Sequence, residues 1–265
     1  MKVIVIGPRG KMGRLITMAA ASRDDMELVA GIAPKGRSYV GQDLGTVAMI
    51  GSELGVPVTD NLANVIQQGD VIIDFSTKEM AMEVLELAIS HKKALVCGTT
   101  GFSPKEMLRF RNAAKEIPML YAANTSKLVN IMNKLLELVT STLKDEIDIE
   151  ILEMHDQWKK DAPSGTSKEM GEIMAHALGK ELEELAVYGR EGSSPRTPGT
   201  IGYHSLRAGN IPSSHTVFFG GIGERLEITH HSYNWECFAR GACDCAAFLA
   251  DKAPGFYTIQ DVLNL

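Results

Sequence analysis

The chain has 265 residues, of which 45% are hydrophobic, and a formal net charge of −6. This size and composition suit one or two globular domains with a core of ordinary size. The mild acidity and the lack of runs of like charge argue against a nucleic-acid-binding surface. No apolar stretch approaches the roughly 18 residues of a membrane helix, and the first apolar run is too short for a signal peptide. We expect a cytoplasmic protein with neither a membrane nor a nucleic-acid partner.

The cysteine and histidine spacings do not indicate a metal centre. The chain has four cysteines: Cys97, Cys237, Cys243 and Cys245. They form no CxxC pair and no zinc spacing, so we predict buried, reduced thiols. The adjacent histidines His230 and His231 have no carboxylate cluster or third ligand at a familiar spacing, and we predict no metal ion.

A glycine-rich turn follows the first predicted strand, residues 3–6. Residues 7–13 have the pattern G-x-x-G-x-x-G, and a helical pattern begins at Leu15. Glycines let the backbone approach a pyrophosphate, and the N-terminus of a helix supplies N–H donors with a partial positive charge. This order of strand, turn and helix predicts a dinucleotide site.

The segment after the second predicted strand, 27–33, bears on the choice of cofactor. NAD enzymes commonly place an acid there to hold the ribose 2′-OH. This chain has the cations Lys35 and Arg37 and no acid. Lysine and arginine bind phosphate well, so we predict NADPH, with NADH as the alternative. A second interpretation is that this loop is simply a basic piece of surface.

Strands and helices alternate up to about residue 126. The predicted elements are strands 70–76, 94–97 and 118–122, with helices over 78–90 and from residue 103. This alternation predicts a Rossmann-type, doubly wound parallel sheet. Ligands of such sheets lie beyond the carboxyl ends of the strands. In this chain those ends are residues 74–77, 98–100 and 122–125.

The pattern changes after residue 126. The predicted elements are helix 127–143, strand 148–154, helix 167–182, antiparallel strands at about 199–207, 214–220 and 224–232, and a last helix over 238–250. They predict an α+β domain with a mixed or antiparallel sheet. We therefore expect a dinucleotide-binding domain of residues 1–126, completed by residues 237–265, and a second domain of residues 127–236.

The loop expected after strand 148–154 carries His155 and Lys159. A histidine is a natural general acid near neutral pH, and a lysine attracts or protonates an anion. Residues 164–166 open the next helix, whose N–H groups form a ready carboxylate site. Gly165 permits close approach, and Thr166 adds a hydroxyl donor. These features predict a site that binds a small anion and protonates it.

Several segments together resemble the dihydrodipicolinate reductase family. They are residues 7–13 (GPRGKMG), 98–102 (GTTGF), 153–155 (EMH) and 159–166 (KKDAPSGT). Further similarity at 198–202, 223–230 and 255–257 extends the resemblance over essentially the whole chain. The DAPSGT element is highly specific to that family, whereas the glycine turn is shared by many dinucleotide-binding proteins.

The resemblance implies the NAD(P)H-dependent reduction of 4-hydroxy-tetrahydrodipicolinate in lysine and diaminopimelate synthesis. It implies that His155 is the acid and that Lys159 is a second proton-transfer or substrate-binding residue. Gly165 and Thr166 would hold a carboxylate of the substrate, and the second domain would join a homotetramer. The cofactor-lining residues that it implies are Gly7, Pro8, Arg9, Gly10, Lys11, Met12, Gly98, Thr99, Thr100, Ala122, Ala123, Asn124 and Thr125.

The chain departs from the family pattern at several positions. Asp156 stands where the family often has a second histidine, and we place it at the substrate site. Its carboxylate would repel a dicarboxylate unless it points away. Thr125 replaces an aromatic residue, Lys127 is added close by, and Trp235 stands where an arginine is expected.

These departures leave two alternatives to the reductase function. One is a paralogous enzyme that reduces another cyclic imine or keto dicarboxylate. The other is a non-catalytic sensor that binds NADP(H). The presence of both His155 and Lys159 argues against the sensor.

Overall fold

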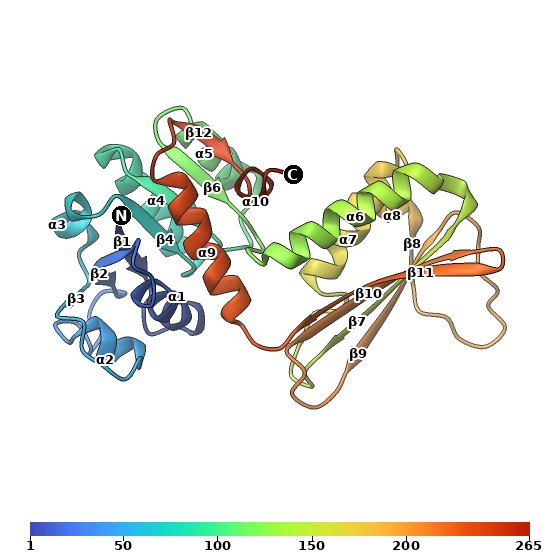
Figure 1. The fold of residues 1–265 in the computed structure, drawn as a ribbon, viewed down its shortest axis with the longest axis horizontal. Helices are drawn as coiled ribbons and strands as arrows, with labels where there is room; N and C mark the ends of the chain where they lie inside the picture. Colours follow the sequence, from blue (N-terminus) through green and yellow to red (C-terminus); the bar gives the residue numbers. More distant parts are fainter. The chain divides into compact units, whose positions relative to one another are not determined.

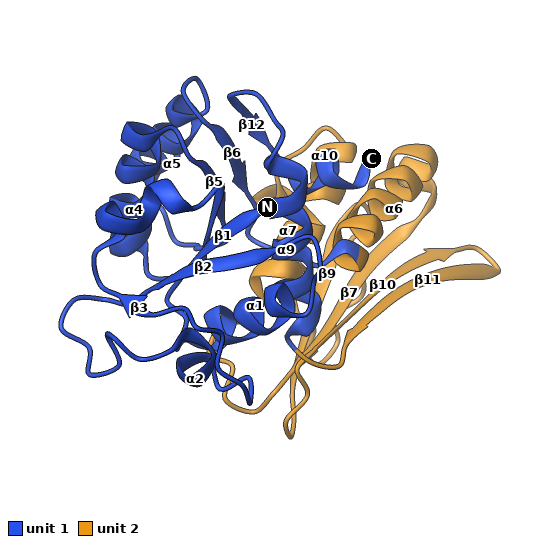
Figure 2. Cartoon of the chain, turned by 60° about the vertical axis from the view of Figure 1, so that its left-hand side comes forward, with its two compact units in different colours: residues 1–127, 235–265 blue, residues 128–234 orange.

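The computed structural model describes residues 1–265, which form two compact units. Unit 1 comprises Met1–Lys127 and Trp235–Leu265, and unit 2 comprises Leu128–Asn234 (Figure 2). The chain thus completes unit 1 after passing through unit 2. None of the helices combines the length and the apolar character needed to cross a membrane.

Unit 1 is built on a seven-stranded parallel sheet in the order β12-β6-β5-β4-β1-β2-β3 (Figure 1). The strands are β1 (Lys2–Ile6), β2 (Glu27–Ile32), β3 (Val58–Thr59), β4 (Val71–Asp74), β5 (Ala94–Cys97), β6 (Pro118–Tyr121) and β12 (Gly255–Tyr257). The strand order reverses at β1, as in doubly wound folds. The predicted Rossmann-type parallel sheet is therefore confirmed.

Helices cover both faces of this sheet. They are α1 (Lys11–Ala21), α2 (Leu44–Ala48), α3 (Leu62–Val65), α4 (Lys78–His91), α5 (Pro104–Ala113), α9 (Glu236–Leu249) and α10 (Ile259–Leu263), with a 3-10 turn at Ile66–Gln68. Side chains alternate between the faces of a strand. In β1, Val3 and Val5 pack in the core that α1 and α9 cover, and Ile4 and Ile6 pack in the core that α4 and α5 cover.

Helix α1 begins at Lys11, four residues before the predicted start at Leu15. The end of the glycine turn is therefore the first turn of the helix. Gly13 makes this possible, because a Cβ there would collide with the carbonyl of Gly7. The glycine spacing thus also serves close packing of the helix against the turn.

Unit 2 contains a five-stranded sheet in the order β11-β10-β7-β9-β8. The strands are β7 (Asp148–His155), β8 (Ala186–Tyr188), β9 (Ile201–Arg207), β10 (Ser213–Gly221) and β11 (Glu224–Ser232). β10 runs antiparallel to β7 and β11, whereas β9 runs parallel to β7 and β8. The sheet is therefore mixed, and the expectation that 199–207 is antiparallel was wrong. The loop 189–200 is long enough to carry the chain back along the sheet before β9 starts.

Three helices cover one face of this sheet. They are α6 (Lys127–Leu143), α7 (Gly165–Ala177) and α8 (Leu182–Leu185), and a 3-10 turn at Lys144–Glu146 follows α6. The single helix predicted over 167–182 was wrong. Helix α7 starts earlier, at Gly165, and stops at Ala177, because Gly179 takes a φ of 71° that ends the helix. His155 is the last residue of β7 rather than part of the following loop.

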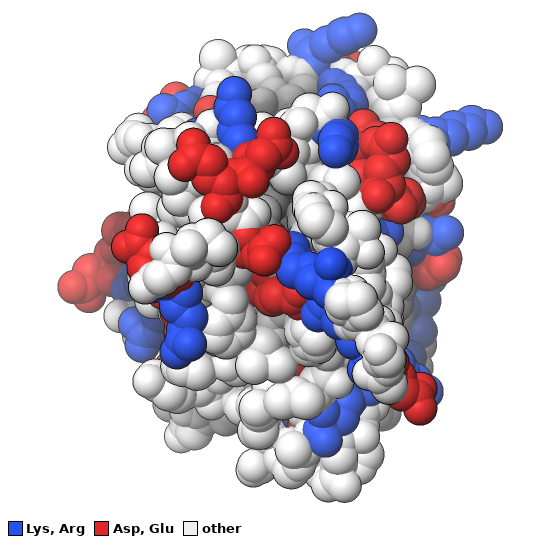
Figure 3. Space-filling model, turned by 90° about the vertical axis from the view of Figure 1, so that its right-hand side faces the viewer, with Lys and Arg blue, Asp and Glu red and all other residues white.

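The other face of the sheet carries a shallow hollow of mixed polarity. It is lined by Glu150, Leu152, Arg190, Arg196, His204 and Phe218. Glu150 is paired there with both arginines and with His204, whose Nε2 lies 2.7 Å from Oε2. On the side of the molecule that Figure 3 shows, basic and acidic side chains are interspersed rather than gathered by sign. That side therefore offers no continuous basic surface for a nucleic-acid backbone.

Candidate active site

The glycine turn of unit 1 is shaped for a phosphate. Gly7 has a φ of 67°, and its N–H donates to the carbonyl of Ile32 at 2.8 Å. Gly10 is the N-cap of α1 and has no side chain to occupy the first N–H groups of the helix. The first turn also contains no acid. The helix N-terminus therefore keeps the partial positive charge that attracts an anionic group.

Two cations of this turn lie over aromatic rings. The guanidinium of Arg9 is 5.1 Å from the centre of the Tyr39 ring, and Nζ of Lys11 is 3.6 Å from that of Trp235. Cation–π attraction restrains both side chains. Trp235, which the sequence left without an explanation, is thus a support for the glycine turn.

The loop after β2 lies beside an acid that is distant in the sequence. Lys35 and Arg37 are exposed there, and the N–H of Gly36 donates to Oδ2 of Asp60 at 3.1 Å. Asp60 follows β3, which is paired with β2 in the sheet. A carboxylate therefore lies beside the loop that carries these two cations.

The carboxyl ends of β4 and β5 are tightly packed. Asp74 is fully buried, and burial raises its pKa to about 6, although Oδ1 accepts a hydrogen bond from the Ser76 N–H at 2.8 Å. Gly98 lies against the ring of Phe75, with which a Cβ would collide. The hydroxyl of Thr99 donates to the carbonyl of Ser76 at 3.4 Å. These contacts join the carboxyl ends of β4 and β5.

The segment after β6 is held by α9. The hydroxyl of Thr125 donates to the carbonyl of Phe238 at 2.7 Å, and Nζ of Lys127 lies 2.7 Å from Asp244. Asn124 accepts from the Ser126 N–H at 2.9 Å. Thr125 and Lys127, the two residues that depart from the family pattern, thus both contact α9, the last long helix of unit 1.

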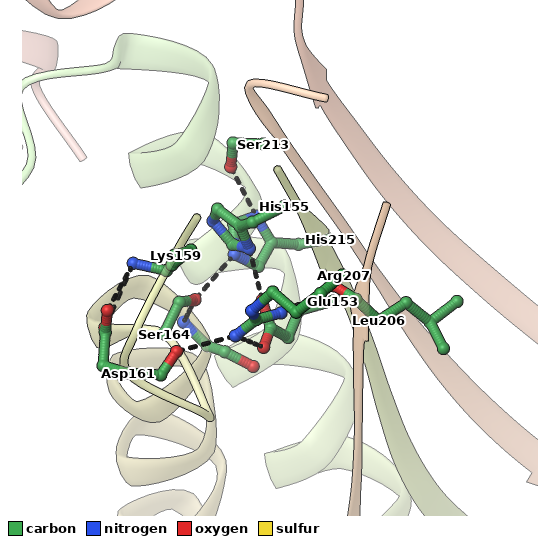
Figure 4. Close-up of polar contacts among 10 residues, drawn as sticks. Glu153, His155, Lys159, Asp161, Ser164, Leu206, Arg207, Ser213 and His215 are labelled. Carbon is green, nitrogen blue, oxygen red and sulfur yellow. Dashed lines mark hydrogen bonds and ion pairs between the residues drawn. The ribbon is translucent and has the colours of Figure 1, made fainter. Parts of the chain in front are cut away.

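In unit 2, His155 is paired with a buried carboxylate. Glu153 lies two residues earlier on β7 and is fully buried, and its Oε2 contacts Nδ1 of His155 (Figure 4). Its Oε1 accepts from Nη2 of Arg207 at 2.8 Å. Burial alone would raise the pKa of Glu153, but the hydrogen bonds from His155 and Arg207 outweigh it and lower the pKa to about 2. Glu153 is therefore ionised at neutral pH.

A second histidine, which the sequence did not single out, lies against His155. The rings of His155 and His215 meet edge to face with their centres 5.3 Å apart. Burial, reinforced by the nearby His155, lowers the pKa of His215 to about 3, so that ring is neutral. Its Nε2 lies 3.1 Å from the hydroxyl of Ser164. His215 thus connects His155 to the start of α7.

Glu153, His155 and His215 lie within 4.8 Å of one another through atoms that could bind a metal ion. Both oxygens of Glu153 already have protein partners, His155 and Arg207. The arrangement is that of an ion-paired network. That the chain uses no metal stays a prediction.

The loop after β7 is organised by its own acids. Nζ of Lys159 lies 2.9 and 3.1 Å from the two carboxylate oxygens of Asp161. The carbonyl of Asp161 accepts from Arg207 at 2.7 Å. Asp156 accepts from the Trp158 N–H at 2.8 Å and so stabilises the first turn of this loop.

The N-terminus of α7 is open in front of Gly165. Ser164 is the N-cap, and its hydroxyl accepts from the Ser167 N–H at 3.2 Å. A Cβ on Gly165 would meet no atom within 4 Å, and the first turn contains no acid. This end of the helix has the charge and the space for a carboxylate.

The structure groups the predicted residues by unit. Unit 2 carries His155, Lys159, Gly165 and the neighbouring Asp156 and Thr166, whereas unit 1 carries the glycine turn and the strand ends. Glu153, Arg207 and His215 were missed as site residues. A glutamate two positions before a histidine on a strand was a usable signal, because such residues share a face.

Comparison with known proteins identifies relatives along the full length. Residues 1–125 match the family described as dihydrodipicolinate reductase, N-terminus, and residues 128–263 match its C-terminus. The 4-hydroxy-tetrahydrodipicolinate reductase of Hahella chejuensis is 43% identical over 265 residues, covering 100% of this chain and 99% of the relative. That of Syntrophus aciditrophicus is also 43% identical, covering 100% and 98%.

A solved structure has a similar fold. It is dipicolinate-bound dihydrodipicolinate reductase from Paenisporosarcina sp. TG-14, with a TM-score of 0.76 and 25% identity over 97% of each chain. Neither the paralogous-enzyme alternative nor the sensor alternative is favoured by these relatives.

Proposed function

Because the chain belongs to the dihydrodipicolinate reductase family, we propose that it reduces 4-hydroxy-tetrahydrodipicolinate to tetrahydrodipicolinate with a nicotinamide cofactor. The overall reaction adds a hydride and a proton to the substrate and releases one water molecule. The observation in unit 2 that carries the proposal is the link from His155 through His215 to the N-cap of α7. This link places the proposed proton donor, His155, close to the helix end that would bind a substrate carboxylate.

The cofactor supplies the hydride, and unit 1 has a fitting cradle for it. Gly7 and Gly13 let the backbone pack so closely that a Cβ on Gly13 would collide with the turn, and α1 presents an N-terminus without an acid. We propose that these residues hold the pyrophosphate. The neighbouring positions would line the rest of the cofactor: Pro8, Arg9, Gly10, Lys11, Met12, Gly98, Thr99, Thr100, Ala122, Ala123, Asn124 and Thr125.

The choice between NADPH and NADH depends on the loop after β2. We propose NADPH, because Lys35 and Arg37 are exposed where the adenosine ribose is expected. Asp60 beside the Gly36 N–H offers a hydroxyl-binding acid and so supports some use of NADH.

The chain's own residues account for substrate binding and protonation. Gly165 and Thr166 at the start of α7 would hold a substrate carboxylate, and Lys159 would attract the second anionic group. His155 would donate the proton that the substrate takes up as the hydride arrives. Asp156 follows His155 directly, and its carboxylate accepts a hydrogen bond from the Trp158 N–H. We place Asp156 at the rim of the substrate site.

We also propose a homotetramer joined through unit 2, in the cytoplasm. The uncovered face of the unit 2 sheet supports this assembly, because Leu152 and Phe218 lie there beside the paired Glu150. Sedimentation of the purified chain gives its mass directly. A monomer at micromolar concentration would contradict the assembly.

The test is an NADPH-oxidation assay with the freshly generated condensation product of pyruvate and aspartate semialdehyde. A panel of other cyclic imines and keto dicarboxylates serves as the control. We expect turnover of the condensation product to exceed that of every other compound. Faster turnover of another compound would identify that compound as the substrate. Binding of NADPH without its oxidation by any compound would indicate a sensor.

A further inference from the structure

We propose that Glu153 is a positioning residue that holds a proton on Nδ1 of His155 and thereby makes Nε2 the nitrogen that donates to the substrate. This inference rests on the proposed function, because it assigns the geometry of the acid in that reaction. Glu153 itself is fully buried on β7 and acts only through His155.

The pairing of atoms dictates the tautomer. Oε2 of Glu153 contacts Nδ1 of His155, and the hydrogen bonds from His155 and Arg207 keep Glu153 ionised at neutral pH. An ionised carboxylate only accepts hydrogen bonds, so Nδ1 must carry hydrogen. When the imidazolium gives up one proton, the proton that leaves is therefore the one on Nε2.

Arg207 extends this control to the neighbouring loop. Its Nη2 donates both to Oε1 of Glu153 at 2.8 Å and to the carbonyl of Asp161 at 2.7 Å. Asp161 in turn holds Lys159 through its carboxylate. One guanidinium thus fixes the carboxylate behind His155 and the loop that carries the second cation.

The charges around His155 are balanced only while Glu153 is ionised. The groups that face it are Glu153 on β7, Arg207 at the end of β9, His215 on β10, and Lys159 and Asp161 in the loop. His215 is neutral, and Lys159 is paired with Asp161. Removing the charge of Glu153 would leave the guanidinium of Arg207 close to His155 without a counter-charge and disfavour the imidazolium.

The substitution Glu153→Gln tests the proposal. Arg207 would take the amide oxygen, so the amide NH₂ would face Nδ1 and favour hydrogen on Nε2 instead. We expect kcat to fall by roughly 10- to 100-fold, within the range that a positioned proton donor contributes. The KM for NADPH should stay within about twofold, and the pH above which kcat declines should move lower.

Glu150→Gln is a matched control. Glu150 lies on the same strand and is also paired with arginines and a histidine, but it belongs to the opposite face of the sheet. Sedimentation should give Glu150→Gln the same mass as the native chain, and we expect its kcat and pH profile to be unchanged. Equal changes of kcat and of its pH profile in the two variants would overturn the positioning role of Glu153.

A readout that needs neither activity nor a variant is long-range ¹H–¹⁵N NMR of ¹⁵N-histidine-labelled protein. We expect neutral His155 to carry its hydrogen on Nδ1 in the native chain and in Glu150→Gln, and on Nε2 in Glu153→Gln. Hydrogen on Nε2 in the native chain would overturn the inference even if Glu153→Gln did not fold. A native chain with the Nδ1–H tautomer that leaves the condensation product unreduced would instead contradict the proposed function.

Discussion

The ammonium of Lys11 lies 3.6 Å from the centre of the Trp235 ring, so an aromatic residue at the N-cap of α9 holds the first residue of α1. These two residues are far apart in the sequence and belong to the same unit. The family's usual arginine at position 235 would repel Lys11, whereas tryptophan attracts it. The substitution therefore places Lys11 in one defined position beside the glycine turn.

We expect Trp235→Ala to weaken NADPH binding by about two- to fivefold, since an exposed cation–π contact contributes roughly 0.5–1 kcal/mol. Trp235→Phe keeps an aromatic face and should lose less. Fluorescence titration with NADPH measures both variants. A Kd for Trp235→Ala equal to that of the native chain would show that the contact does not serve the cofactor.

His155→Ala should lower kcat by about 10² or more, the usual scale for loss of a positioned acid. Because His155 belongs to unit 2 and the proposed cofactor cradle to unit 1, the Kd for NADPH should be nearly unchanged. Steady-state kinetics and a separate cofactor titration test the two statements. Parallel losses in kcat and in NADPH affinity would refute the role given to His155.

Replacing Lys35 and Arg37 by alanine should weaken NADPH binding more than NADH binding. Both side chains are exposed at the loop after β2, where the 2′-phosphate is expected. Asp60→Asn should have the opposite effect and weaken NADH more, because it removes the acid next to Gly36. The ratio of the two cofactors' KM values reports both effects. An unchanged ratio in the double alanine variant would identify the loop as ordinary surface.

Asp74 should make the stability of unit 1 depend on pH. Burial raises its pKa to about 6 from an unfolded value of 3.8, so the fold favours the protonated carboxyl. Its stabilising contribution is fully present below pH 3.8 and is lost as the pH rises past 6. Asp74→Asn stays neutral and should be more stable than the native chain at pH 8, by up to about 3 kcal/mol. Denaturant unfolding at pH 4 and pH 8 checks this, and an equal difference at both values would contradict it.

Much of unit 1 could be predicted from the sequence because its signals are local. Buried parallel strands are continuous apolar runs, and the cap of α5 has Ser103, Pro104 and Glu106 in the expected order. The start of α1 was misplaced, because residues 11–13, which belong to the glycine motif, already form its first turn. Local periodicity does not show how far a helix continues into a glycine turn.

Unit 2 was less predictable because its contacts depend on strand pairing. His215 lies opposite Glu153 across β10 and β7, and Arg207 lies opposite His155 across β9 and β7. No local pattern reveals such registers. Helix α6 was located correctly, yet its apolar residues Leu128, Leu135 and Leu138 are exposed. Periodicity located the helix but did not identify the face that packs on the sheet.

The most direct test of the central claim follows the hydride itself. The chain is supplied with NADPH carrying deuterium at C4 of the nicotinamide, on either face, and with the fresh condensation product of pyruvate and aspartate semialdehyde. Mass spectrometry of the product is expected to show one deuterium per NADPH oxidised for one of the two labelled forms, and none for the other. Oxidation of NADPH without deuterium in the product from either form, or no oxidation at all, would contradict reduction of this imine dicarboxylate.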